Sequence, residues 1–258
     1  MRRLLGSLLF TLMLLAAGCR SSPSGAPNPT ASRSSPSGAP NPTAGPNGVA
    51  QKKQQKSKQD LAIESILRRG GMVQFDPEDL SKAVVFVDVH GFHKAVEALD
   101  SVAPLTKLRE VNLHDARFTD GDLERFRGLP NLQAVNLSGT KITDAGLAIL
   151  STLPNLRELN LNETHVTDAG LQYLLNLPNL QELSLYKTKV TDAGLAQLRN
   201  VKKLQKLALG GTSSITDKGM VHLAGMSELR QLMLISTSVS KDAIQDLQDG
   251  FPHLRIIH

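Results

Sequence analysis

The chain repeats itself with a period of 24 residues, and this period limits its possible folds more than any other feature. Three consecutive segments begin at Leu129, Leu153 and Leu177 with Leu-Pro-Asn-Leu and carry Thr-Asp-Ala-Gly-Leu in their second half. The last two agree at 16 of 24 positions. Looser copies begin at Leu105, Val201 and Met226, and a degenerate copy spans residues 81–104. One such unit cannot bury its apolar face alone, so the copies are expected to stack into a solenoid.

The first half of each repeat, L-x-x-L-x-L-x-x-T-x-V, predicts a short strand. Leu156, Leu159 and Leu161 combine a turn with the period-two alternation of a strand that faces a core on one side. Stacked copies place these strands in parallel, about 4.8 Å apart. A threonine follows each strand, and its hydroxyl is expected to bond the backbone of the adjacent coil. This column comprises Thr140, Thr164, Thr188, Thr212 and Thr237.

The second half of each repeat, V-T-D-A-G-L-x-x-L, predicts a short helix. In the copy from Leu129, Thr143 is suited to the N-cap and Asp144 to the first turn, where the helix dipole favours negative charge. Leu147 and its neighbour three residues later point to the core. Gly146 costs about 1 kcal/mol inside a helix. Its recurrence indicates that a side chain there would clash with the next coil, and the aspartates are interpreted as structural caps.

These motifs resemble leucine-rich repeats of the cysteine-containing and ribonuclease-inhibitor-like subtype, with Thr in the place of the usual Asn or Cys. The resemblance covers residues 81–258 and implies an α/β fold. The expected fold is a right-handed, horseshoe-shaped solenoid, with parallel strands on the concave face and short helices on the convex face. Residues 60–80 contain an apolar helical pattern before Gly70-Gly71 and a strand pattern at 72–75, so we expect them to cap the solenoid.

The first 18 residues have the build of a secretory signal peptide. Met1-Arg2-Arg3 precedes an apolar run, and small residues lead to Cys19, the one cysteine of the chain. Ala-Ala-Gly-Cys resembles a bacterial lipoprotein lipobox, which implies that Cys19 is lipidated and becomes the first mature residue. The protein is then exported to the cell envelope, and in a double-membraned host it is anchored in the outer membrane. Ordinary cleavage after Ala17 is the alternative.

Residues 19–59 are predicted to be a disordered tether. The sequence SSPSGAPNPTA occurs at 21–31 and again at 34–44, and the basic run QKKQQKSKQ follows at 51–59. The basic run either contacts anionic lipid head groups or serves as a solvated linker. Residues 1–60 carry eight Lys/Arg and one acid, whereas residues 61–258 carry 21 basic and 23 acidic residues. The repeats are therefore slightly acidic, and we expect no nucleic-acid partner.

The strand positions between the leucines form the expected binding surface, because repeat proteins bind partners on their concave face. The anticipated ligand is a protein or peptide, or an envelope polymer, and the oligomeric state stays open. The candidate ligand-binding residues are Asp88, Glu110, Asn112, Asn136, Glu158, Asn160, Glu182, Tyr186, Met233 and Ile235.

The sequence leaves two other functions open. His90 and His114 share a column, with Asp88 and Asp115 nearby, so a metal or hydrolase site at the first coils is one alternative. The other is an F-box-like ubiquitin-ligase adaptor, which the repeat subtype suggests although no F-box precedes the repeats. No phosphate loop, His-Glu-x-x-His or nucleophile motif occurs. The sequence therefore predicts a binding protein without enzymatic activity, cofactor or metal.

Overall fold

The computed structural model describes residues 56–258, which form one compact unit with its own core. The signal peptide, Cys19 and the tether up to residue 55 lie outside the described residues, so those expectations stay predictions. Within residues 56–258, none of the helices is long and apolar enough to cross a membrane.

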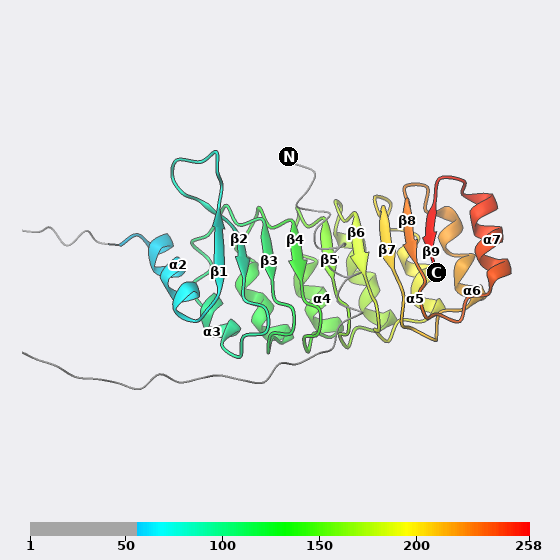
Figure 1. Ribbon diagram of the computed structural model, residues 1–258, viewed down its shortest axis with the longest axis horizontal. Helices are drawn as coiled ribbons and strands as arrows, with labels where there is room; N and C mark the ends of the chain where they lie inside the picture. The colour runs from blue at the N-terminus through cyan, green and yellow to red at the C-terminus, as the bar shows by residue number, and fades with distance from the viewer. Residues whose placement is uncertain (1–55) are drawn as a thin grey trace, which may run out of the picture. The chain divides into compact units, whose positions relative to one another are not determined.

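One nine-stranded sheet runs the length of the unit, in the order of the sequence from β1 to β9. The strands β2 to β9 are parallel, and β1 is antiparallel to β2. Figure 1 shows them side by side along the solenoid. Their bounds are β1 Met72–Phe75, β2 Val84–Asp88, β3 Glu110–Asn112, β4 Ala134–Asn136, β5 Glu158–Asn160, β6 Glu182–Ser184, β7 Lys206–Ala208, β8 Gln231–Met233 and β9 Arg255–Ile257.

Short helices return the chain from each strand to the next, as the repeat predicts (Figure 1). A period of 24 residues leaves room for only one to three turns, and several of these turns are 3-10 rather than α-helical. The helices are α3 Ala95–Leu99, η1 Asp120–Phe126, α4 Asp144–Leu150, η2 Asp168–Asn176, α5 Asp192–Leu198, α6 Asp217–Met220, η3 Leu223–Gly225 and α7 Lys241–Gly250.

The N-terminal cap consists of α2 (Lys58–Arg68) and β1. Ser57 and Asp60 form a capping box at the start of α2, which therefore begins two residues inside the range assigned to the tether. Ala62 and Ile66 are fully buried and join the core of the first coils. The helix thus covers the apolar end that a solenoid would otherwise expose.

A single hydrophobic core runs between the strands and the helices. Its columns are the leucines of the repeat: Leu159 pairs in register with Leu183, which pairs with Leu207, and all three are buried. The leucines of the helices, such as Leu147 and Leu150, close the core from the other side. The inward positions predicted from the period are therefore confirmed.

The aspartate of the repeat connects successive coils. The Oδ1 atom of Asp144 accepts the backbone N–H of Thr167 at 2.8 Å, and its Oδ2 accepts the hydroxyl at 2.6 Å. The same two bonds join Asp120 to Thr143, Asp168 to Thr191 and Asp192 to Thr216. We call this series the Asp–Thr ladder. The first-turn position predicted for Asp144 is confirmed, but its hydrogen-bond partner is the next coil.

The ladder explains the glycine of the repeat. A Cβ atom at Gly170 would lie 2.3 Å from Oδ1 of Asp144, and one at Gly194 would lie equally close to Asp168. The expected clash with the neighbouring coil is therefore confirmed. The N-cap prediction is confirmed too, because the Thr167 hydroxyl oxygen accepts the N–H of Ala169 at 3.3 Å.

The threonine hydroxyls after each strand were predicted to bond the backbone of the adjacent coil, and this prediction is wrong. The Thr164 hydroxyl is buried, but it donates to the carbonyl of Leu161 in its own coil at 2.6 Å. Thr140, Thr188 and Thr237 make the same bond to the leucine three residues before them. These hydroxyls therefore stabilise the turn within a coil and do not join two coils.

Candidate binding surface

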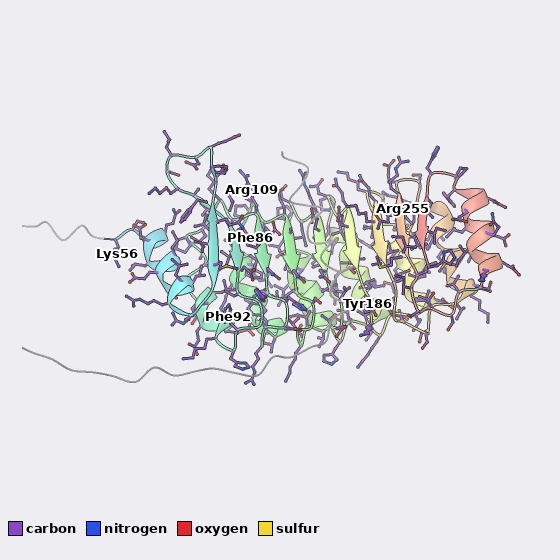
Figure 2. All side chains as sticks on the ribbon, in the orientation of Figure 1. Lys56, Phe86, Phe92, Arg109, Tyr186 and Arg255 are labelled. Carbon is purple, nitrogen blue, oxygen red and sulfur yellow. The ribbon has the colours of Figure 1, made fainter. Side chains whose placement is uncertain are left out.

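The side of the sheet that faces away from the core carries the candidate residues; we call it the strand face. Adjacent strands pair residue for residue, so equivalent positions form straight columns. Phe86 and Arg255 mark the two ends of the first column in Figure 2. That column is Phe86, Glu110, Ala134, Glu158, Glu182, Lys206, Gln231 and Arg255, as the period of the repeat requires.

Three glutamates gather in the first column. Glu110 and Glu158 are separated by one strand, which places their backbones about 10 Å apart. The residue between them is Ala134, whose short side chain lies low between the two carboxylates. On the other side, Glu182 forms an ion pair with Lys206, with 2.6 Å between Oε1 and Nζ. We use the name acidic notch for the group of Glu110, Ala134 and Glu158.

Glu158 is the most perturbed group of the acidic notch. Its Oε2 atom is buried and accepts no hydrogen bond from the described residues. Burial, followed by the charges of Glu182 and Glu110, raises the pKa of Glu158 to about 8 against the opposing effect of Lys206 and Arg157. Burial and the nearby Asp88 raise the pKa of Glu110 to about 7. At neutral pH the notch therefore holds protons that a positive partner would displace.

The second column takes part in the fold itself. Asp88, Asn136 and Asn160 are buried, and each side-chain oxygen accepts the backbone N–H two residues later in the chain. Asn112 also accepts the amide of Asn136 at 2.9 Å. These four candidate residues lie on the strand face as predicted, but their polar atoms already stabilise the turn that follows each strand.

The strand face carries an apolar patch toward its C-terminal end, next to Lys206, Gln231 and Arg255 of the first column. Tyr186 is half-buried, Ile235 is exposed and Met233 is buried. Gly210 lies between Tyr186 and Ile235, and a Cβ atom there would be 2.9 Å from the Tyr186 ring. The sequence places Gly210 in the same column as Tyr186 and Ile235, but neither Gly210 nor Gly211 was among the candidate binding residues. The signal was a glycine at position 210, where the preceding coils carry Ser138, Asn162 and Tyr186, so the tyrosine ring can approach the backbone there.

The histidines of the first coils form two separate pairs. Nδ1 of His90 lies 2.7 Å from Asp88, and Nε2 of His114 lies 3.2 Å from Asp115. Within residues 56–258, no three His, Cys, Asp or Glu side chains come together as metal ligands. The structure therefore does not assemble the four residues of the metal alternative into one site.

Comparison with known proteins supports the interpretation of the repeats. A leucine rich repeat model matches residues 106–166, and a model of two leucine rich repeats matches residues 154–197. Among solved structures, internalin C2 from Listeria monocytogenes str. 4b F2365 is similar, with 24% identity and a TM-score of 0.49 over 64% of this chain and 77% of that chain. The search of curated proteins gave no match. Residues 106–197 are thus leucine-rich repeats, and the described unit folds as a leucine-rich repeat solenoid.

Proposed function

We propose that this protein is an exported lipoprotein without enzymatic activity whose strand face binds a protein partner in the cell envelope. Leucine-rich repeat folds typically serve as protein-binding scaffolds, which supports the binding role. The lipid anchor rests on the sequence, in which Cys19 follows a short apolar run and Ala-Ala-Gly. No observation favours the adaptor or hydrolase alternatives.

The acidic notch is the part of the strand face that engages the partner. The observation that carries this assignment is the buried Oε2 atom of Glu158, which lacks a hydrogen bond among the described residues. A lysine or arginine side chain above Ala134 would lie between Glu110 and Glu158 and supply a positive charge, and it would donate to Oε2 once the Glu158 carboxylate turns outward. The apolar patch at Tyr186 and Ile235 then adds contact area farther along the sheet.

The binding proposal is tested by photo-crosslinking in cells with a label beside the notch. The full chain and its Glu158→Lys and Glu182→Lys variants are compared for their crosslinked partners. Glu124→Lys is the control, because it makes the same charge reversal on η1, on the opposite side of the core. We expect Glu158→Lys to reduce the main crosslink at least tenfold and Glu124→Lys to leave it intact.

Two outcomes contradict the notch as the binding site. One is a partner list that is the same for Glu158→Lys and the unmodified chain. The other is an equal loss with Glu124→Lys, which would indicate a general effect of charge. Crosslinking to a polysaccharide that survives proteolysis would assign the surface to an envelope polymer instead.

The lipid anchor has a separate test. A Cys19→Ser variant is expressed in a bacterium fed with a labelled fatty acid, and its fractionation is compared with that of the unmodified chain. We expect the label and the membrane attachment to be lost together. Membrane attachment without label in the unmodified chain would contradict lipidation, and release of that chain into the soluble fraction after cleavage would support ordinary signal processing.

A further inference from the structure

The N-terminal end of the solenoid exposes an unpaired strand edge beside apolar side chains. The strand β1 is the first of the sheet and pairs only with β2 within the described residues. Five of the eight large hydrophobic residues that residues 56–258 expose lie at this end. They are Leu61, Leu67, Met72, Phe75 and Leu80. Such a concentration marks an interaction surface, whereas single exposed apolar residues do not.

The backbone groups at the open edge can be assigned from the hydrogen bonds between the strands. The odd-numbered residues of β2 direct their backbone N–H and C=O groups toward β3, because the carbonyl of Val85 and the N–H of Val89 form hydrogen bonds on that side. Its even residues therefore face β1, where Phe86 is opposite Gln74. Alternation then directs the N–H and C=O of Val73 away from β2, to the open edge. These groups are the ones that an added strand would use.

The two ends of the sheet differ. The strand β1 has the sequence Met-Val-Gln-Phe, with no charge and no proline to discourage pairing. At the other end, β9 carries the exposed Arg255, and α7 next to it is polar on its outer side. No large hydrophobic residue is exposed within residues 241–258. The edge of β9 is thus protected, whereas the edge of β1 is open.

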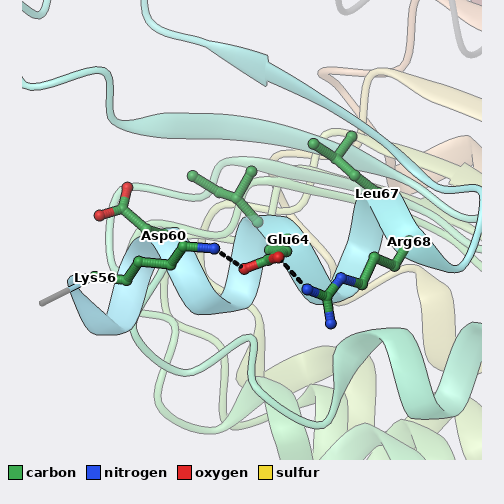
Figure 3. A pocket seen from close by; sticks show the side chains of 6 residues that line it. Lys56, Asp60, Glu64, Leu67 and Arg68 are labelled. Atoms are coloured by element: carbon green, nitrogen blue, oxygen red, sulfur yellow. Dashed lines mark hydrogen bonds and ion pairs between the residues drawn. The ribbon is translucent and has the colours of Figure 1, made fainter. Parts of the chain in front are cut away.

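Figure 1 shows α2 next to β1, and Figure 3 shows the side chains on the outer surface of this helix. Glu64 lies between Lys56, at 2.5 Å, and Arg68, and the three side chains form an ion-pair chain on the outer surface of the helix. Ile63 and Leu67 flank that chain. The helix therefore presents apolar groups next to the open strand, with charges of both signs around them.

We propose that this end pairs with a second copy of the chain, so that the two β1 strands run antiparallel and join the two sheets. This inference is independent of the ligand of the strand face. The strand is self-complementary in this arrangement, because pairing centred on Val73 places the outward N–H and C=O of Val73 in each copy opposite those of the other. The charges that flank β1 do not oppose it: Arg69 pairs with Glu97 and Asp76 pairs with Arg109 within the chain.

The same charges argue against a membrane as the occupant. Residues 56–82 carry five Lys/Arg and five Asp/Glu, so the described part of this end is neutral and would gain nothing from anionic lipid. Lipid also offers no ladder of backbone partners to Val73. A two-fold axis normal to the sheet is required for antiparallel pairing, so both strand faces point to the same side of the dimer.

Sedimentation equilibrium of residues 56–258 tests the proposal, since this unit contains a complete core and its own cap. We expect a dimer at micromolar concentration. Met72→Lys combined with Phe75→Lys places charges on the edge and should raise the dissociation constant at least about 100-fold. Val221→Lys is the control, because Val221 is exposed outside the cap and should leave the dimer unchanged.

Cysteine pairing tests the register. Pairing centred on Val73 places Met72 of one copy opposite Gln74 of the other in a non-hydrogen-bonded pair, with Cα atoms about 4.5 Å apart, which suits a disulfide. A mixture of Met72→Cys and Gln74→Cys chains should form disulfide-linked dimers at least tenfold more than either variant alone.

Three results overturn the proposal. The first is a monomeric unit at 100 µM, a concentration chosen to exceed the expected dissociation constant. The second is equal crosslinking in the mixture and in the separate variants, which indicates random collision. The third is a dimer of residues 56–258 that becomes a monomer when residues 20–55 are present, which would assign the edge to the preceding segment of the same chain.

Discussion

At the scale of single residues, the fold holds the carboxylate of Glu158 in an unfavourable environment. Its pKa is raised to about 8, mainly by burial, so its ionised form is less stable in the folded protein than in the unfolded chain. For an acid with a raised pKa, the stabilising contribution is complete below the unfolded value and is lost as the pH rises through the folded value. The loss therefore falls between about pH 4.5 and pH 8.

This sign predicts the effect of Glu158→Gln. The variant should unfold at the same urea concentration as the unmodified unit at pH 4, and should be about 2 kcal/mol more stable at pH 9, after allowance for solvent screening at this partly exposed site. Urea unfolding at the two pH values measures the difference. The exposed Glu163, changed to Gln, is the control, and an equal gain in that variant would contradict the explanation.

Gly170 and Asp144 are predicted to act as one unit. Gly170→Ala should destabilise the protein by about 2–4 kcal/mol, because the added methyl group displaces Asp144 from its two bonds to Thr167. Asp144→Ala alone should cost about 2–3 kcal/mol. Thermal unfolding of the double variant should show a coupling of at least 1 kcal/mol. Additive losses would show that the glycine serves another purpose.

These residues also show what the sequence could reveal. The period predicted that Gly170 needs space, since a helical glycine repeated in every copy has a steric cause. It did not reveal the Asp–Thr ladder, because Asp144 bonds a residue 23 positions later and a local pattern suggests only a helix cap. The burial of Asn136 and Asn160 was not predicted either, because it results from the turn after each strand, whose backbone N–H donates to each side-chain oxygen.

At the scale of elements, α2 contributes to the stability of the fold through its N-cap and through its buried side chains, and the two contributions can be measured separately. Ser57→Ala removes the capping box and should cost about 1 kcal/mol. Ile66→Ala removes a fully buried side chain between the helix and the first coils and should cost about 2–5 kcal/mol. Chemical denaturation gives both values. A larger loss for Ser57→Ala would mean that local helix formation, not packing, holds the cap in place.

The strands were predicted more accurately than the helices. Each strand is three residues long in most coils, and its register follows directly from the period, because Leu159 must pair with Leu183 if every coil has the same length. The helical half has no such constraint. The segment from Asp168 forms a 3-10 helix where the equivalent segment from Asp192, which shares its Asp-Ala-Gly-Leu start, forms an α-helix.

At the scale of the whole molecule, the period predicts which deletions the fold tolerates. Removal of residues 153–176 deletes one complete coil and joins Thr152 to Leu177, which begins an equivalent copy. We expect a folded protein whose melting temperature falls by less than about 10 °C, because each coil contacts mainly its neighbours. Removal of residues 153–164 should prevent folding. Circular dichroism distinguishes the two outcomes, and equal behaviour would contradict the one-dimensional description.

The Asp–Thr ladder has a direction. Each coil offers a carboxylate to the coil that follows it and presents a threonine to the coil before it, so any internal unit fits behind any other. A duplicated segment of DNA that encodes one period would therefore produce a compatible coil without any compensating substitution. The length of the strand face can change by whole units in a single genetic event, while the N-terminal cap of α2 and β1 stays as it is.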